Sequence, residues 1–150
     1  MGTRDITLPQ DLTASAARLR LAVTRTARRL RQEAAGELSP TGASALASVE
    51  RHGPLTPSEL ARIERVKRPT ATRTLSALAA DGLISRTPDP SDGRSALVSV
   101  TPAGRDRLRR LRGRKNAYLA RRMRAMPPQD VRALERAAEV LERMLEGERA

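Results

Sequence analysis

The sequence predicts a mainly α-helical fold that carries one small two-stranded β-hairpin. Apolar residues recur every three to four positions through most of the chain, which is the spacing of an amphipathic helix. Residues 95–100 instead alternate between polar and apolar side chains, with Ala96, Val98 and Val100 on one face, as a strand does. A length of 150 residues suits one domain, and we expect residues 1–150 to form one.

Four helices are expected in the first half of the chain, at residues 10–34, 40–52, 57–64 and 69–80. The third begins with a capping box, in which Thr56 caps the helix and Glu59 reaches back to it. The fourth begins at Pro69 after Arg68, which is a poor side-chain cap, so its first N–H groups lack a local acceptor. A bound phosphate can supply that acceptor, and solvent water is the alternative.

The helical period ends at Gly82, and a hairpin follows. Residues 83–86 and 95–100 are the two predicted strands. Between them, residues 87–93 contain two prolines and a glycine, which exclude a helix and predict a turn. Two strands joined by a loop of this length form a hairpin that protrudes from the domain.

Two further helices are expected after the hairpin, at about 102–125 and 128–147. Pro127 and Pro128 separate them. The last helix carries its apolar side chains at a spacing of three to four residues, which gives it one apolar face.

The composition excludes several classes of protein. Without cysteine there is no disulfide, thiolate zinc site or cysteine nucleophile, and the single histidine, His52, cannot build a metal site. No nucleophile–base pair or glycine-rich phosphate loop is present, so we expect no catalytic residues, no metal and no cofactor. No apolar run approaches 18 residues and no signal core opens the chain, so we expect no membrane partner and a cytoplasmic protein.

The charge favours double-stranded DNA as the partner. There are 29 Lys and Arg residues against 17 Asp and Glu, a formal net charge of +12. Tyr118 is the only aromatic residue, whereas proteins that bind single strands or RNA stack bases on aromatic rings. Neutralising duplex phosphates needs only cations. Both a sequence-specific regulator and an architectural protein of low specificity fit this charge.

Residues 55–100 have the order of a helix-turn-helix followed by a hairpin that serves as a wing. In such a motif the second helix lies in the major groove. The polar side chains on its outward face are expected to contact the DNA: Thr70, Thr72, Arg73 and Ser76. Arg94, at the hairpin tip, suits the narrow minor groove, and Asp92 is expected to hold its guanidinium extended. The alternative is a solvated ion pair in a turn.

In residues 59–104 the chain resembles the core of a MarR-type winged helix-turn-helix transcription regulator. Four segments carry the resemblance: Thr70-Ala71-Thr72-Arg73, Asp81-Gly82-Leu83-Ile84-Ser85-Arg86, the Asp-x-Arg of the wing, and the Leu-Val-x-x-Thr-x-x-Gly that ends at Gly104. Pro69 and Thr74 depart from the pattern, in which a small polar and an apolar residue are frequent.

The resemblance implies a homodimer that binds a pseudo-palindromic site. Residues 38–104 would form the DNA-binding core, and residues 10–36 and 105–147 would form dimerisation helices. The apolar residues expected in the dimer interface are Leu12, Leu19, Val131, Leu134, Leu141 and Leu145. The residues expected near phosphates are Arg68, Arg86, Ser39 and Thr41.

The resemblance also implies a repressor that a small amphipathic or anionic effector releases from DNA. The crevice for the effector would lie between the dimerisation helices, called here the outer helices, and the DNA-binding core, called here the winged core. It would be lined by Leu, Val, Ala and Met, with Tyr118 the only ring. Arginines of the first or fifth helix would face the anion. Residues 105–124 hold ten basic residues against one acid, Asp106, which either contact DNA or effector or form a solvated helix face.

Overall fold

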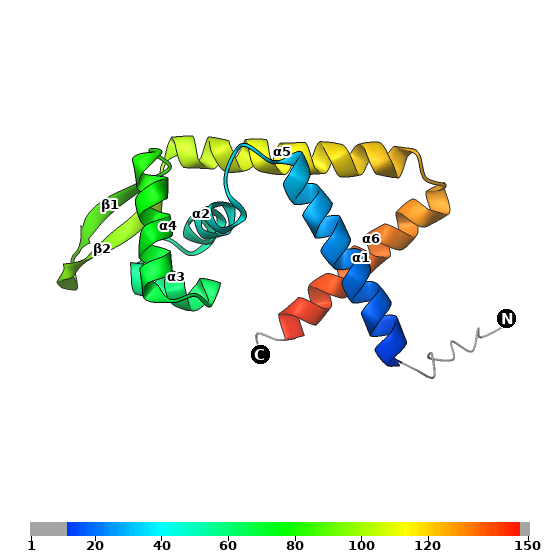
Figure 1. Cartoon of the computed structure of the whole chain (residues 1–150), viewed down its shortest axis with the longest axis horizontal. Coiled ribbons are helices and arrows are strands. Elements are labelled where there is room, and N and C mark those ends of the chain that lie inside the picture. The colour runs from blue at the N-terminus through cyan, green and yellow to red at the C-terminus, as the bar shows by residue number, and fades with distance from the viewer. Residues whose placement is uncertain (1–11, 148–150) are drawn as a thin grey trace.

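The computed structural model describes residues 12–147 (Figure 1). Its elements, in chain order, are α1 (Leu12–Glu33), α2 (Pro40–His52), α3 (Pro57–Glu64), α4 (Arg68–Ala80), β1 (Ile84–Asp89), β2 (Asp92–Val100), α5 (Pro102–Arg124) and α6 (Pro128–Gly147). The two strands pair antiparallel. The prediction of a mainly α-helical fold with a two-stranded sheet is confirmed.

The strands are longer than the sequence predicts. β1 continues through Pro88 to Asp89, and β2 already begins at Asp92. The predicted turn cluster is therefore largely part of the hairpin arms. Pro88 is tolerated because each strand of a two-stranded sheet has one unpaired edge, where the missing N–H costs no ladder hydrogen bond. The pairing becomes irregular at this point, with a register shift between Pro88 and Asp89.

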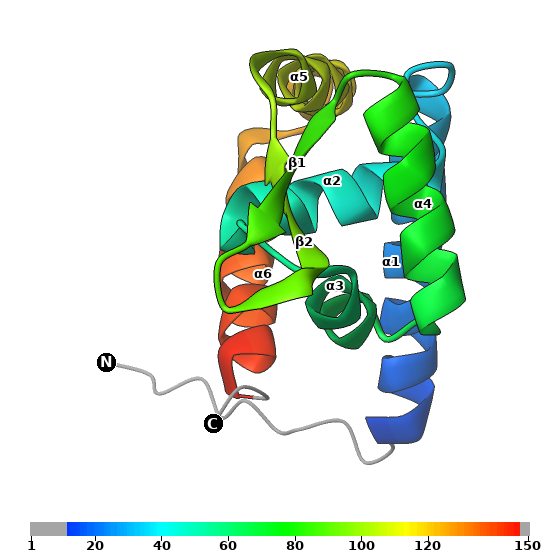
Figure 2. The same ribbon diagram turned by 90° about the vertical axis from the view of Figure 1, so that its left-hand side faces the viewer.

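The hydrophobic core lies between α2, α3, α4, the base of the hairpin and the start of α5. Its largest fully buried side chains are Leu46, Leu60, Leu75, Leu83, Val49 and Val98. Burying a side chain of this size stabilises a fold by about 1.5–3 kcal/mol. Leu55 adds a bridge to β2, because its N–H and C=O both bond to Val98, at 3.0 and 2.7 Å. This core holds α4 and the hairpin in one rigid unit, seen end-on in Figure 2.

The start of α5 is fixed against the turn between α4 and β1. Thr101 caps the helix by accepting a hydrogen bond from the Gly104 N–H at 3.1 Å, and its hydroxyl donates to the Gly82 carbonyl at 2.7 Å. A Cβ on Gly104 would lie 2.2 Å from the Leu83 carbonyl oxygen, so only glycine allows this approach. The direction in which α5 leaves the core is thereby set.

The outer helices have little to pack against within the described chain. α5 runs away from the winged core; the end of α1 meets it near its middle, and α6 leads away from its far end (Figure 1). Turned by 90°, α1 and α6 stand on opposite sides (Figure 2). Neither contains a buried residue. Leu12, Leu19, Leu134 and Leu145 are 46–63% exposed, and Val131 and Leu141 are half-buried.

Candidate nucleic-acid interface

A helix-turn-helix forms from α3 and α4. The capping box at the start of α3 is present: Thr56 Oγ1 accepts from the Glu59 N–H at 3.2 Å, and Glu59 Oε2 accepts from the Thr56 N–H at 2.7 Å. At the other end, the Glu64 carboxylate accepts from the hydroxyls of Ser44 and Ser48 on α2. Both ends of the first helix of the motif are thereby held in place.

The α4 helix divides into a buried face and an exposed face. Ala71, Leu75 and Leu78 are at most 2% exposed and face the core. The opposite face carries the exposed side chains that the sequence assigns to DNA: Arg68, Thr70, Thr72, Arg73 and Ser76. Thr74, one of the two departures from the family pattern, is half-buried and donates to the Thr70 carbonyl at 3.0 Å. It therefore belongs to the inner side of the helix.

The start of α4 differs from the prediction by one residue. The helix begins at Arg68, and Lys67 is the capping residue, because the extended backbone that a cap needs occurs there, at φ −70° and ψ 145°. No side chain caps the helix, and its first turn contains no acid. The expectation of an uncapped N-terminus is thus confirmed, and the positive end of the helix dipole carries two cations.

The hairpin and α4 are joined by a side-chain contact that the sequence does not reveal. Arg86 Nη2 donates to Ser76 Oγ at 3.2 Å, and both residues are exposed. The two lie ten positions apart, on different elements, so helical periodicity gives no sign of the pair. The contact brings one predicted phosphate ligand beside the predicted groove-binding face.

At the tip of the wing, two carboxylates organise the backbone. Asp89 Oδ1 accepts from the N–H and the hydroxyl of Ser91, at 2.9 and 2.8 Å. Asp92 Oδ1 accepts from the Arg94 N–H at 3.0 Å. The expected contact from Asp92 to the guanidinium of Arg94 is therefore replaced by one to its backbone. Asp92 lies only two residues before Arg94. Its short side chain therefore reaches the backbone N–H of Arg94 more readily than the far end of the Arg94 side chain.

These hydrogen bonds favour the ionised form of Asp89. The N–H and hydroxyl of Ser91 hold the pKa of the Asp89 carboxyl below its ordinary value, and desolvation opposes them. The turn is therefore tied to a charged carboxylate at neutral pH.

The start of α2 lies near α4. Ser39 caps α2 by accepting from the Gly42 N–H at 3.0 Å. A cavity of about 340 Å³ between the two helices is lined by Ser39 and by Arg73, so the structure brings these two predicted residues into one region. Thr41 is exposed, and nothing in the described chain brings it to the others.

The predicted DNA-contact arginines are free of acidic partners. None of Arg68, Arg73, Arg86 and Arg94 forms an ion pair within residues 12–147. Arg65 and Lys67, in the turn before α4, are also exposed and form no ion pair within residues 12–147. Sequence reasoning passes over these two, although positions 65–68 hold three cations in four residues. Unpaired cations leave the positive potential of this surface available to phosphates.

The basic stretch of α5 is partly neutralised by acids. Arg112 Nη2 lies 2.7 Å from Glu50 Oε2 on α2, and Arg109 pairs with Asp106 on its own helix. Three more arginines form ion pairs with the carboxylate of Glu37, in the connection between α1 and α2. They are Arg107, Arg110 and Arg114. The stretch is therefore more than a solvated face, because it ties α5 to the neighbouring elements.

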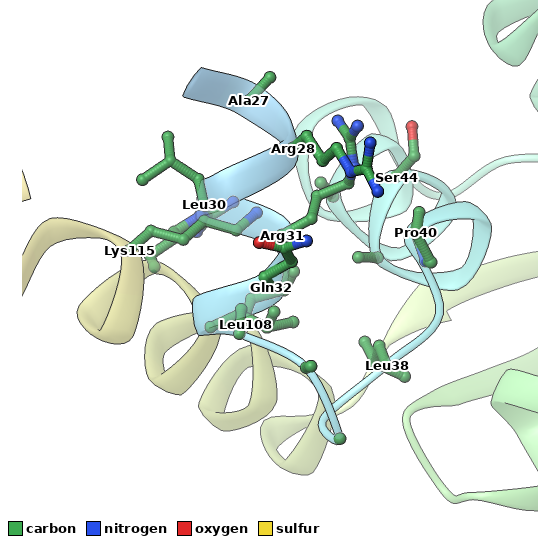
Figure 3. A pocket seen from close by; sticks show the side chains of 17 residues that line it. Ala27, Arg28, Leu30, Arg31, Gln32, Leu38, Pro40, Ser44, Leu108 and Lys115 are labelled. Carbon is green, nitrogen blue, oxygen red and sulfur yellow. The ribbon is translucent and has the colours of Figure 1, made fainter. Parts of the chain in front are cut away.

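A larger cavity, of about 660 Å³, opens between the end of α1, α2 and α5 (Figure 3). Much of its wall is apolar, with side chains such as Leu30 and Leu108. Four cations also line it: Arg28, Arg31, Arg112 and Lys115. Among the described residues, no valine, methionine or tyrosine lines it, contrary to expectation. Tyr118 lies farther along α5, with the guanidinium carbons of Arg29 and Arg121 at 5.3 and 5.7 Å from its ring centre.

Two kinds of feature are absent from residues 12–147. No helix there is both long enough and apolar enough to cross a membrane. In the same part of the chain, His, Asp and Glu side chains do not gather into a group that could hold a metal ion.

Comparison with known proteins agrees with this geometry. The model of the MarR family matches residues 38–96, from the start of α2 to the middle of β2. An HTH-type transcriptional regulator of Mycobacterium tuberculosis is 36% identical over 124 residues, which is 82% of this chain and 87% of that protein. The chain belongs to the MarR family. It is a transcriptional regulator with a DNA-binding winged helix, and the family is not one of enzymes.

Solved structures show the same fold for this MarR-family chain. A transcriptional regulator from Pseudomonas aeruginosa has a TM-score of 0.77 and 37% identity, covering 93% of this chain and 98% of that one. A mutant of MepR from S. aureus, bound to an oligodeoxyribonucleotide, has a TM-score of 0.66 at 17% identity, covering 89% of this chain and 96% of that one. The second similarity concerns the fold alone.

Proposed function

We propose that this protein is a homodimeric repressor that binds pseudo-palindromic sites in double-stranded DNA with sequence specificity. The observation that carries the proposal is the exposed polar face of α4 beside a wing whose arginines have no acidic partner within the described chain. MepR, which shares the fold, has been solved on an oligodeoxyribonucleotide. Because its partner is chromosomal DNA, we assign the protein to the cytoplasm.

The residues divide into three roles on the DNA. Base edges in the major groove would be contacted from α4 by Thr70, Thr72, Arg73 and Ser76. Phosphates would be bound by Arg68 and Arg86 and, from the start of α2, by Ser39 and Thr41. Arg94 would lie in the minor groove, with Asp92 fixing the backbone that presents it.

Dimerisation follows from the exposed apolar faces of the outer helices. Exposed apolar side chains gathered on helices in this way are typical of a protein interface. The interface would use Leu12 and Leu19 of α1 with Val131, Leu134, Leu141 and Leu145 of α6. Residues 10–36 and 105–147 would then form the dimerisation part, and residues 38–104 the DNA-binding core. The two copies of α4 would be held at a fixed distance.

The test is selection from a random-sequence duplex library at about physiological salt, followed by sequencing of the retained DNA. The proposal predicts an enriched inverted repeat with half-sites about one helical turn apart. Retention of DNA without an enriched sequence would contradict it and favour an architectural protein of low specificity. No retention under any salt condition would also contradict it.

We further propose that a small amphipathic anion relieves repression by binding in the 660 Å³ cavity. The apolar wall suits a ring or short chain, and the cations from α1 and α5 suit a carboxylate. A ligand shifts the protein away from DNA only if it binds the DNA-free arrangement more tightly. The wall of this cavity is shared between the outer helices and the winged core, so a ligand bound there would respond to a movement of one relative to the other.

The effector proposal is tested with a panel of aromatic carboxylates and their uncharged amides. A carboxylate should release the selected operator and raise the melting temperature of the free protein, and its amide should do neither. The variant Arg31→Gln, in the cavity wall, should weaken this effect. Arg25→Gln removes an exposed cation of the same helix outside the wall and should leave it unchanged. Equal responses of the two variants would place the anion elsewhere.

A further inference from the structure

One carboxylate, in the connection between α1 and α2, is surrounded by arginines of α5. Glu37 Oε1 lies 3.1 Å from Arg114 Nη2. Its Oε2 lies 3.3 Å from Arg107 Nε and 3.7 Å from Arg110 Nε. Arg107 Nη1 also donates to the Glu37 backbone carbonyl at 2.7 Å. Both the side chain and the backbone of Glu37 are therefore held by one helix.

The inner pair of the cluster, Glu37 and Arg107, is partly sheltered from solvent. The Glu37 side chain is 14% exposed and that of Arg107 is 27% exposed, while Arg110 and Arg114 are about half exposed. Arg107 Nε is buried, and its ion-pair contact with Oε2 lacks the geometry of a hydrogen bond. The arginines stand at positions i, i+3 and i+7, on one face of α5. Screening by water and salt is weaker for the Glu37–Arg107 pair than for an ion pair on the surface.

The position of Glu37 in the fold gives the cluster a mechanical role. The connection that it holds, residues 34–39, contributes to the walls of both cavities. Gly36, at φ +90°, lines the larger cavity, and Leu38 lines both. Glu37 itself lines the smaller one, whose opposite wall includes Arg73 of α4. A shift of this connection relative to α5 therefore reaches the DNA-binding helix.

We propose that Glu37 is a positioning residue that fixes the winged core relative to the outer helices. It does so by anchoring the connection between α1 and α2 to α5, whose first turn is packed in the core at Gly104 and which continues outward to α6. The inference rests on the proposed dimer, in which the angle between the winged core and the outer helices sets the distance between the two copies of α4. Without the contacts between Glu37 and the arginines of α5, this angle varies. A smaller fraction of the dimers then has the spacing of α4 helices that matches the operator.

The alternative is that the cluster only adds stability to the monomer. The two are separated by comparing Glu37→Gln with Glu33→Gln. Each variant removes one negative charge, but Glu33 pairs only within α1, 2.6 Å from Arg29. Removing an acid from a DNA-binding protein strengthens its general attraction to phosphates. A weaker operator complex of Glu37→Gln therefore cannot arise from charge alone.

The first measurement is operator affinity at fixed salt. If the matching arrangement falls to between a third and a tenth of the population, the affinity of Glu37→Gln falls by about 3- to 10-fold, because apparent affinity scales with that fraction. Glu33→Gln should bind as tightly as the parent or slightly more tightly. Equal affinities of the two variants would overturn the proposal. If Glu37→Gln does not fold, Arg114→Lys, which keeps the positive charge but removes the guanidinium nitrogen that contacts Glu37 Oε1, is expected to give a smaller loss in the same direction.

The second measurement is the distance between the two winged cores in the free dimer. The chain has no cysteine, so Ser58→Cys, on the exposed surface of α3, gives one spin label per protomer. Pulsed electron paramagnetic resonance should give a narrow distance distribution for the parent and Glu33→Gln, and a broad one for Glu37→Gln. Equally narrow distributions would contradict the role of Glu37 alone. Absence of a dipolar signal in the parent would contradict the dimer, and the proposal with it.

Discussion

Arg86 of β1 donates a hydrogen bond of 3.2 Å to the hydroxyl of Ser76 on α4. The contact joins the wing to the helix that we assign to the major groove. An arginine side chain loses considerable rotamer freedom when it binds a phosphate. Ser76 supplies part of that ordering before DNA arrives, so we expect the two residues to act as a pair.

A double-mutant cycle measures this coupling. Ser76→Ala and Arg86→Ala should each weaken operator binding, and the double variant should lose about 0.5–1 kcal/mol less than the sum of the single losses. Fluorescence anisotropy with the selected operator provides the three values. Additive losses, within about 0.3 kcal/mol, would mean that the two residues act independently on DNA.

The wing arginine is expected to matter for affinity but not for folding. Arg94→Ala should weaken operator binding by about 1–3 kcal/mol and leave the thermal unfolding transition unchanged, since Arg94 is exposed. Arg122→Ala removes an equal charge from the exposed far end of α5 and serves as the control. Unchanged operator affinity of Arg94→Ala would count against a role for the wing.

Two glycines of α5 should respond in opposite ways to the same substitution. A Cβ on Gly104 would overlap the Leu83 carbonyl oxygen, so Gly104→Ala should destabilise the protein by about 1–3 kcal/mol. No atom lies within 4 Å of a Cβ on Gly113, so Gly113→Ala should stabilise it by about 0.5–1 kcal/mol. Urea titration gives both values. A destabilising Gly113→Ala would show that α5 is packed differently there.

The order of the wing tip should depend on pH. Because the folded pKa of Asp89 lies below its ordinary value, the stabilisation of the turn is complete above the unfolded pKa and is lost as pH falls through the folded one. Carboxyl chemical shifts of Asp89 in an NMR titration report the pKa directly. Ser91→Ala removes one of the two hydrogen bonds and should raise it. An unchanged pKa of Asp89 in Ser91→Ala would show that the Ser91 hydroxyl does not influence the turn.

The sequence predicts the helices well because proline and capping residues mark their ends. Pro40, Pro57, Pro102 and Pro128 each begin a helix where the sequence places it. The hairpin is harder to delimit, since Pro88 signals a turn in the sequence but lies within an edge strand in the structure. Local propensity is overridden there by the free edge of the two-stranded sheet.

The site is only partly predictable, because its arrangement depends on contacts between elements. The exposed face of α4 follows from helical periodicity, which separates Thr72 and Arg73 from Leu75. The cluster around Glu37 does not, since its partners lie about 70 positions away in the chain. The contact of Asp92 with the backbone of Arg94, rather than with its guanidinium, depends on the conformation of the turn.

In the proposed dimer, two copies of α4 are held at a fixed spacing. The most direct test compares the selected operator with one in which about five base pairs, half a helical turn, are inserted between its half-sites. This insertion moves one half-site to the opposite face of the duplex, so we expect the affinity to fall by at least about 100-fold. Leu134→Glu, which places a charge on the exposed apolar face of α6, should bind both duplexes weakly and alike. Equal, tight binding of both duplexes by the unsubstituted protein would contradict the fixed spacing.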